Sequence, residues 1–273
     1  MVEKKLRYPT GVRPLLVEET ARRRRIESRF VAILEDAGFA EVVLPIIDYV
    51  DPYAALVSRD SSRSSYRFVD REGDLVAIRS DFTPMVARAL APSLTAADLP
   101  LRVFYRGDVI RCDASRLGVN RELFQIGAEI VGDPSLDADI EAMTLAVRIA
   151  REFGVAPRVV YSDTAVAETL TEEERRAVAT KRALPPSEIA RRLDEATAAR
   201  LETLARALDP AIFSLHLDDI DEDSGYYTGV RFRLFGADSR KAIAQGGRYD
   251  RVYQRFGTPA AAAGFTFTID DLD

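Results

Sequence analysis

Residues 109–132 read VIRCDASRLGVNRELFQIGAEIVG, which is the end of one β-rich run, a loop and a second β-rich run. In the second run, Gln125 and Glu129 lie four residues apart. Because side chains alternate between the two faces of a strand, both residues point to the same face. An amide and a carboxylate on a face that would otherwise be apolar indicate a ligand site on a sheet.

The rest of the chain surrounds this stretch with further strands and with helices. Apolar residues recur at helical spacing over 17–37 and 137–153. The other β-rich runs, two of which have the pattern of a hairpin, are 41–49, 66–81, 157–163, 226–247 and 257–270. Strands mostly follow strands, so the sequence predicts an α+β fold in which helices flank an antiparallel sheet.

One segment differs in composition from this core. Residues 171–207 contain few β-branched residues and many Glu, Arg, Ala and Leu, which predicts two or three short helices. We interpret 164–208 as a small helical insertion within a single core that spans 1–273.

Composition narrows the function classes. The formal net charge of -6 over 273 residues argues against wholesale binding to a phosphate backbone. The single cysteine, Cys112, allows no intrachain disulfide and fits a reducing compartment. No run is long and apolar enough to cross a membrane. With His216 as the only histidine, a zinc site is not expected. We therefore expect a cytoplasmic protein without a metal, a cofactor or a membrane partner.

Charged residues also gather at the ends of predicted strands. Arg79 and Asp81 end one run, Arg111 and Asp113 end another, and Arg248 follows a glycine pair. Each one taken alone fits a solvated residue at the rim of a sheet. Together with Gln125 and Glu129 they suit a zwitterionic ligand, because carboxylates bind an ammonium group and guanidinium groups bind a carboxylate or phosphate.

Two further patterns have a structural interpretation. Arg22–Arg25 is a run of four arginines inside the first predicted helix. Four consecutive helical residues span a full turn and cannot share one face, so we expect a solvated helix start and not a nucleic-acid patch. EVVLPIIDY (41–49) is predicted to be a buried strand that ends near Pro45.

Several motifs, in the same order along the chain, resemble the catalytic core of histidyl-tRNA synthetase, a class II aminoacyl-tRNA synthetase. LPIIDY is similar to the first class motif, which lies at the dimer interface, and VIRCDASRLGVNRELFQIGAEIVG is similar to the second. AIRSDFTPMVARA, YYTG and QGGRYDRV are similar to the segments that bind histidine. The resemblance covers nearly the whole chain and implies a class II synthetase-like fold.

The sequence departs from the synthetase pattern at positions where the synthetases have arginines that act on ATP. Glu222 stands where the synthetases have a catalytic arginine, and Asp271 stands at the end of the third class motif where they have an arginine that contacts ATP. A carboxylate beside a developing phosphate anion repels it. The synthetases' anticodon-binding domain has no counterpart in the sequence. We therefore expect no catalytic residues and no tRNA partner.

The histidine half of the pattern is kept. The resemblance implies that the α-amino group and imidazole are held by Asp81, Thr83, Gln125 and Glu129, the carboxylate by Arg111, and the imidazole face by Tyr227 beside Tyr226. This is the pattern of the regulatory subunit of ATP phosphoribosyltransferase, a synthetase paralogue. It implies histidine as effector, a self-dimer, and a hetero-octamer with a short-form catalytic subunit. A minimal synthetase and a free-standing histidine sensor remain the alternatives.

Overall fold

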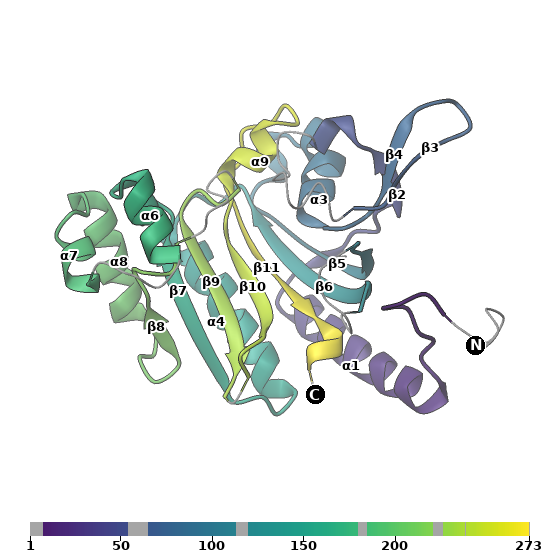
Figure 1. Ribbon diagram of the computed structural model, residues 1–273, viewed down its shortest axis with the longest axis horizontal. Coiled ribbons are helices and arrows are strands. Elements are labelled where there is room, and N and C mark those ends of the chain that lie inside the picture. The colour runs from purple at the N-terminus through teal and green to yellow at the C-terminus, as the bar shows by residue number, and fades with distance from the viewer. Residues whose placement is uncertain are drawn as a thin grey trace.

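The computed structural model describes residues 8–53, 65–112, 120–179, 185–220, 226–237 and 239–272. Its centre is an eight-stranded sheet with the order β1-β5-β6-β11-β10-β9-β7-β8 (Figure 1). These strands are β1 (Ala40–Glu41), β5 (Leu101–Ile110), β6 (Glu122–Val131), β7 (Pro157–Asp163), β8 (Phe213–Leu215), β9 (Val230–Gly236), β10 (Ala242–Arg248) and β11 (Ala262–Thr268). The neighbours from β5 to β7 are antiparallel, as predicted, whereas the edge pairs β1–β5 and β7–β8 are parallel.

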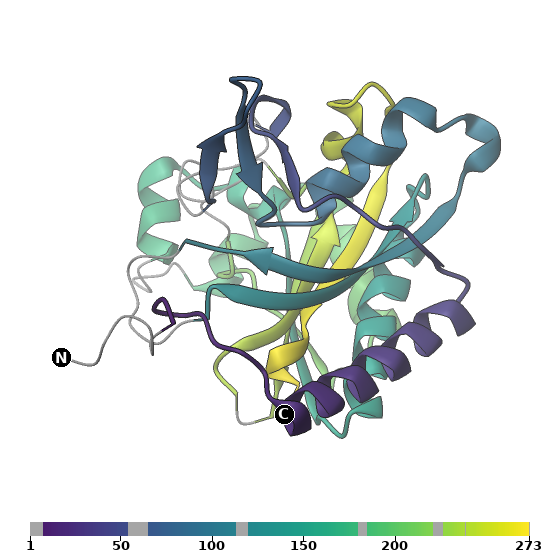
Figure 2. The ribbon, with the colours of Figure 1, turned by 90° about the vertical axis from the view of Figure 1, so that its right-hand side faces the viewer.

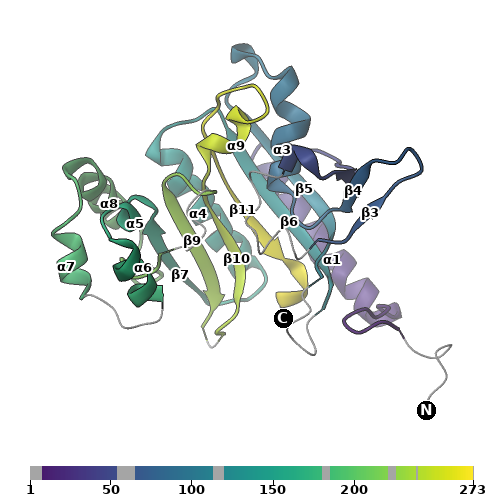
Figure 3. The ribbon, with the colours of Figure 1, turned by 45° about the horizontal axis from the view of Figure 1, so that its top comes forward.

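Two long helices cover one face of this sheet. They are α1 (Val17–Asp36) and α4 (Leu136–Glu152), which lie behind the strands in Figure 3. Phe30 of α1 meets Phe267 of β11 edge to face at 5.2 Å between ring centroids, and Ile126 and Ile130 of β6 belong to the same core. Because strand side chains alternate, the odd-numbered positions between them face the opposite side.

Within the described residues, two helices cover one end of the opposite face. There lie α3 (Thr83–Leu90) and α9 (Asp250–Gln254) (Figure 3). A second sheet, with the order β2-β4-β3, stands on the far side of β5 and β6 from α1 (Figure 2). Its strands are β2 (Ile47–Tyr49), β3 (Arg67–Val69) and β4 (Leu75–Ile78). The β3–β4 pair confirms the first predicted hairpin, and β9–β10 confirms the second.

Short helices connect the parallel strands β7 and β8. They are α5 (Ala165–Glu168), α6 (Glu172–Ala179), α7 (Pro186–Ala190) and α8 (Glu195–Ala207), which confirms the helical nature of 171–207. That 164–208 is a separate insertion stays a prediction. The remaining turns are the 3-10 segments η2 (Asp51–Tyr53), η3 (Ala91–Ser93), η4 (Ala96–Asp98) and η5 (Ile269–Asp271).

The prediction of a buried strand over 41–49 is wrong. The chain leaves the large sheet after Glu41 and joins the small one at Ile47. Between them Val43 is 89% exposed and Ile46 is 60% exposed. The segment bends because Pro45 has no N–H to donate to a neighbouring strand. In addition, the guanidinium group of Arg79 donates hydrogen bonds to the carbonyls of Leu44 and Pro45.

The arginine run is solvated only in part. Arg24 and Arg25 are exposed as predicted, but Arg23 forms an ion pair with Asp270 of η5 at 2.6 Å. Arg22 donates to the backbone carbonyl of Leu272 at 3.3 Å. These two arginines fasten the last turn of the described chain to α1. Among the described helices, none is both long and apolar enough to cross a membrane.

Candidate functional site

A cavity of about 40 Å³ lies between the start of α3, the segment before β9, and strands β10 and β11. Asp81 and Thr83 line it at the start of α3, and Tyr226 and Tyr227 line it just before β9. Gln245, Tyr249 and Thr266 complete the polar wall. We call this the inner cavity. About 10–15 Å³ of such space is enough for one water molecule, so the inner cavity has room for a small polar group.

Glycine is required where Glu129 approaches Tyr249. Gly264 of β11 is the register partner of Glu129 on β6. A Cβ atom on Gly264 would lie 2.1 Å from Glu129 Oε2 and 2.4 Å from the Tyr249 hydroxyl. No other residue type leaves room for these two groups side by side.

Glu129 is the most buried acid of the site, with 1% of its surface exposed. Thr83 Oγ1 donates to Glu129 Oε1 at 2.8 Å. Glu129 Oε2 and the Tyr249 hydroxyl are both buried, and within the described part of the chain neither has a hydrogen-bond partner. Burial, reinforced by the charge of Asp81, raises the pKa of Glu129 to about 8. Burial therefore favours the protonated form of this carboxyl near neutral pH.

Tyrosines surround this carboxyl. Tyr226 packs edge-on against Tyr227, with 5.0 Å between ring centroids, and lies 5.6 Å from Tyr249. The Tyr105 hydroxyl lies beside the hydroxyls of Thr83 and Thr266. Burial raises the pKa of Tyr105 and of Tyr226 well above the usual value. The hydroxyls are neutral, so Glu129 meets a polar but cation-free wall.

A second cavity, of about 150 Å³, adjoins the first and shares Gln245 and Thr266 with it. We call it the outer cavity. Arg111, Gln125, Lys241 and Asp271 supply its polar wall. Lys241 Nζ lies 2.7 Å from Asp271 Oδ1, and Arg111 Nε donates to the Ser80 carbonyl at 3.2 Å. The outer cavity therefore has two cations and one carboxylate in its wall.

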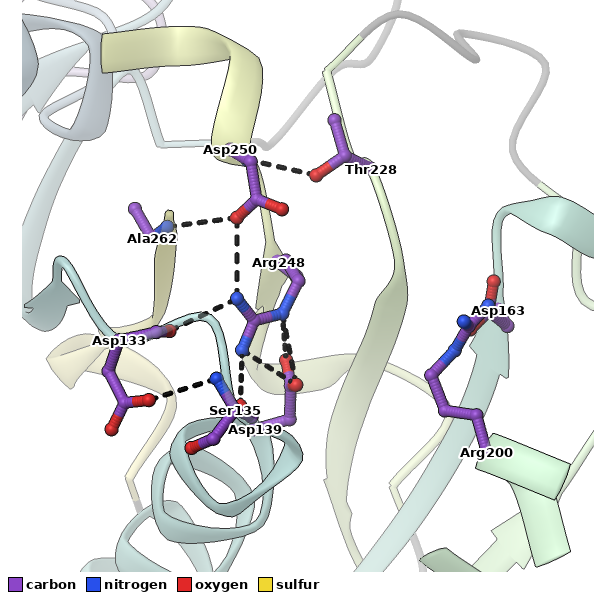
Figure 4. Close-up of polar contacts among 9 residues, drawn as sticks. All are labelled: Asp133, Ser135, Asp139, Asp163, Arg200, Thr228, Arg248, Asp250 and Ala262. Atoms are coloured by element: carbon purple, nitrogen blue, oxygen red, sulfur yellow. Dashed lines mark hydrogen bonds and ion pairs between the residues drawn. The ribbon is translucent and has the colours of Figure 1, made fainter. Parts of the chain in front are cut away.

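Two arginines predicted to serve a ligand are committed to the scaffold. Besides the two carbonyls before β2, Arg79 binds the carbonyl of Asp108. Arg248 forms a bidentate ion pair with Asp139 of α4, with Nη2–Oδ2 at 2.8 Å (Figure 4). It also donates to the carbonyls of Ser135 and Asp133. Their guanidinium groups face buried carbonyls and carboxylates because the strand ends are covered by neighbouring segments, which the sequence pattern alone does not show.

Asp250 continues this network to the neighbouring strand ends. Its carboxylate accepts from Arg248 Nη1 at 3.3 Å and from the Ala262 backbone at 2.9 Å (Figure 4). Its backbone N–H donates to Thr228 Oγ1 at 2.9 Å. The network holds together the end of β10 and the starts of β11, α4 and α9. Figure 4 also shows the separate pair of Arg200 and Asp163, at 2.7 Å, near the end of β7.

The structure brings the other predicted site residues together in two groups. Asp81, Thr83, Tyr226 and Tyr227 line the inner cavity, and Arg111, Gln125 and Asp271 line the outer one. Glu129 lies next to Gly264 of the inner wall and lines neither cavity. Glu222 and Asp113 lie outside the described residues.

Sequence reasoning missed the remaining wall residues. They are Tyr105, Lys241, Gln245, Tyr249 and Thr266. Tyr249 and Gln245 lie within the quoted stretch QGGRYDRV and could have been named from it. Lys241 gives no signal, because a lysine near a hairpin turn is normally solvated.

Other reactive residue types stand apart from these cavities. His216 is exposed one residue beyond β8, and its Nδ1 lies 3.6 Å from Asp218 Oδ1. Cys112 is a half-buried free thiol. Over the described ranges, no three or more His, Cys, Asp or Glu side chains are placed to hold a metal ion.

Known proteins share both the sequence pattern and the fold. The sequence profile of the family described as histidyl-tRNA synthetase matches residues 11–186 and 165–272. The ATP phosphoribosyltransferase regulatory subunit of Geobacter sulfurreducens is 32% identical, and the match covers 96% of this chain and 71% of that protein. The chain belongs to the ATP phosphoribosyltransferase regulatory subunits, within the histidyl-tRNA synthetase family. The regulatory subunit of Moorella thermoacetica is 28% identical, with 98% and 81% covered.

Solved structures agree with this family's fold. A regulatory subunit/histidyl-tRNA synthetase from Bacillus halodurans superimposes with a TM-score of 0.84 at 22% identity, covering 98% of this chain and 82% of that one. The histidyl-tRNA synthetase of S. aureus gives 0.76 at 20% identity, with 98% and 72% covered. The predicted class II synthetase-like fold, an antiparallel sheet flanked by helices, is thereby confirmed.

Proposed function

We propose that the chain is a non-catalytic regulatory subunit of ATP phosphoribosyltransferase, which activates a short-form catalytic subunit in the first step of histidine biosynthesis and transmits feedback by histidine. The observation that carries this proposal is the pair of cavities around Glu129 and Arg111. A buried acid with one unpartnered oxygen lies at one end, and guanidinium and ammonium groups lie at the other. This arrangement matches the two ends of a free amino acid.

We propose one orientation for histidine across the two cavities. Its carboxylate would lie beside Arg111 in the outer cavity, and its imidazole would reach Glu129 and Tyr249 through the inner one. An imidazole nitrogen can take the proton that the buried carboxyl holds, which gives an imidazolium–carboxylate pair in a dry site. Asp81 and Thr83, at the start of α3, are placed for the α-ammonium group.

The wild-type protein and Glu222→Arg should both give only background histidine-dependent ATP–pyrophosphate exchange. One donor at a developing charge contributes about 2.7–4 kcal/mol to a transition state, and Asp271 would still face any phosphate in the outer cavity. A histidyl-tRNA synthetase assayed in parallel is the positive control. Exchange above background in the wild-type protein would assign the chain to the minimal synthetases instead.

The partner claim is tested by co-expression with a tagged short-form catalytic subunit. We expect a complex of the two chains that makes phosphoribosyl-ATP and is inhibited by histidine, whereas the catalytic subunit alone is less active. A tRNA pull-down serves as the second arm. Recovery of tRNA without any gain in catalytic activity would favour a tRNA-binding adaptor, and histidine binding without a partner would favour a free-standing sensor.

We also propose the self-dimer, formed through the segment before β2. Val43 and Ile46 are among the most exposed large apolar side chains of the described chain, and exposed apolar side chains indicate an interface where they form a patch. Val43→Glu with Ile46→Glu should convert a dimer into a monomer in light scattering at micromolar concentration. The control is Leu215→Glu on the edge strand β8, which should stay dimeric. A wild-type monomer would contradict the proposal.

A further inference from the structure

The outer cavity contains a feature that amino-acid binding alone does not need. Asp271 presents a carboxylate to a cavity whose other charged groups, Arg111 and Lys241, are cations. Its side chain is 17% exposed, and Asp271 Oδ2 is buried without a hydrogen-bond partner within the described chain. Lys241, which meets Oδ1, is 69% exposed, so its ammonium group is largely hydrated.

The turn that carries this carboxylate is fixed in place. The neighbouring Asp270 points the other way, where it pairs with Arg23 of α1 at 2.6 Å and accepts from the Phe124 backbone at 3.3 Å. Asp270 lines a different groove, along α1, and not the outer cavity. The backbone of this turn therefore cannot shift without breaking the contacts of Asp270.

We propose that Asp271 determines the ligand class of the outer cavity: it admits the single carboxylate of an amino acid and rejects ligands with a phosphate or polyphosphate group. Two cations and one anion leave one excess positive charge, which one carboxylate neutralises. A polyphosphate brings several negative charges next to a fixed carboxylate with an unpartnered oxygen, and this repulsion is strong where water is partly excluded. The inference rests on the proposed function only for the identity of the accepted amino acid.

The test compares two isosteric changes in the same turn. Asp271→Asn and Asp270→Asn each remove one negative charge, but only the first faces the outer cavity. Each variant and the wild-type protein are titrated calorimetrically with inorganic pyrophosphate, ATP and histidine, and melting curves verify that all three are folded. A third variant, Asp271→Asn with Arg111→Met, tests whether any gain in affinity for pyrophosphate or ATP arises in the outer cavity.

We expect Asp271→Asn to bind pyrophosphate and ATP at least about tenfold more tightly than the wild-type protein, because one like charge beside a polyanion is gone. Histidine affinity should rise by a smaller factor, since a single carboxylate gains less. Asp270→Asn should bind polyphosphate with the affinity of the wild-type protein. Adding Arg111→Met to Asp271→Asn should abolish the gain in polyphosphate affinity.

The inference is overturned if Asp271→Asn and the wild-type protein bind pyrophosphate equally. It is also overturned if Asp270→Asn gains as much, because the effect would then come from net charge. Failure of the proposed function looks different: the wild-type protein would not bind histidine, whatever the pyrophosphate titrations give.

Discussion

Arg248→Met should lower the free energy of unfolding by about 3–5 kcal/mol, because it leaves the Asp139 carboxylate buried without its cation. The arginine is 8% exposed and donates to Asp139, Asp250 and two backbone carbonyls. For a chain of this size each kcal/mol shifts the melting temperature by roughly 2–4 °C. We therefore expect differential scanning calorimetry to show a fall of roughly 6–20 °C.

The matched control is Arg206→Met. Arg206 pairs with Glu202 at 2.9 Å, but the two side chains are 69% and 67% exposed, and exposed pairs of this kind contribute little. Its melting temperature should stay close to that of the wild-type protein. If Arg248→Met and Arg206→Met have the same melting temperature, the network of Figure 4 does not stabilise the fold. Arg248 would then again be a candidate ligand residue.

The contrast between Arg248 and Glu129 shows which features of the site can be predicted from the sequence. Alternation along a strand predicted the face of Gln125 and Glu129 correctly, because the pleat is a property of the backbone and needs no neighbour. For Arg79 and Arg248, whose position at strand ends was the basis for a ligand role, the prediction was wrong. Whether a strand-end guanidinium binds a ligand or a carbonyl depends on which distant segment covers it. Asp139 is 109 residues away from Arg248.

The segment around Pro45 was misjudged for a related reason. An apolar run predicts burial, but it does not say against what. Val43 and Ile46 are apolar and exposed, which fits a surface that another chain covers. The resemblance to the synthetase motif placed that surface at a dimer interface, whereas strand patterning alone placed it in the core. The sequence did not predict the contact between Lys241 and Asp271. A hairpin turn and the segment after β11 have no common sequence signal.

Glu129→Gln should change the pH dependence of stability in the empty protein. The pKa of Glu129 is about 8, against a usual value of 4.5, so the folded state holds this proton more tightly than the unfolded state. The tighter binding of this proton makes its full contribution to the stability of the folded state below pH 4.5. This contribution is lost as the pH rises through 8. Glutamine has no proton to lose. The stability of the variant relative to the wild-type protein should therefore rise by about 1.4 kcal/mol per pH unit within that window.

The same substitution should weaken histidine binding by roughly ten- to hundredfold at neutral pH, as measured by calorimetric titration. An amide keeps the shape of the protonated carboxyl but cannot become the anionic partner of an imidazolium ion, and a hydrogen bond to a charged group contributes about 1.5–3 kcal/mol. Glu122→Gln is the control, because Glu122 begins the same strand but lines the groove along α1 and not the two cavities. Unchanged histidine affinity together with a much lower melting temperature would assign Glu129 to the scaffold. No ion pair to Arg79 or Arg111 supports that alternative in the described chain, where both guanidinium groups donate to backbone carbonyls. The expected pair of results, weaker binding with no loss of stability at neutral pH, therefore distinguishes a ligand-binding acid from a structural one.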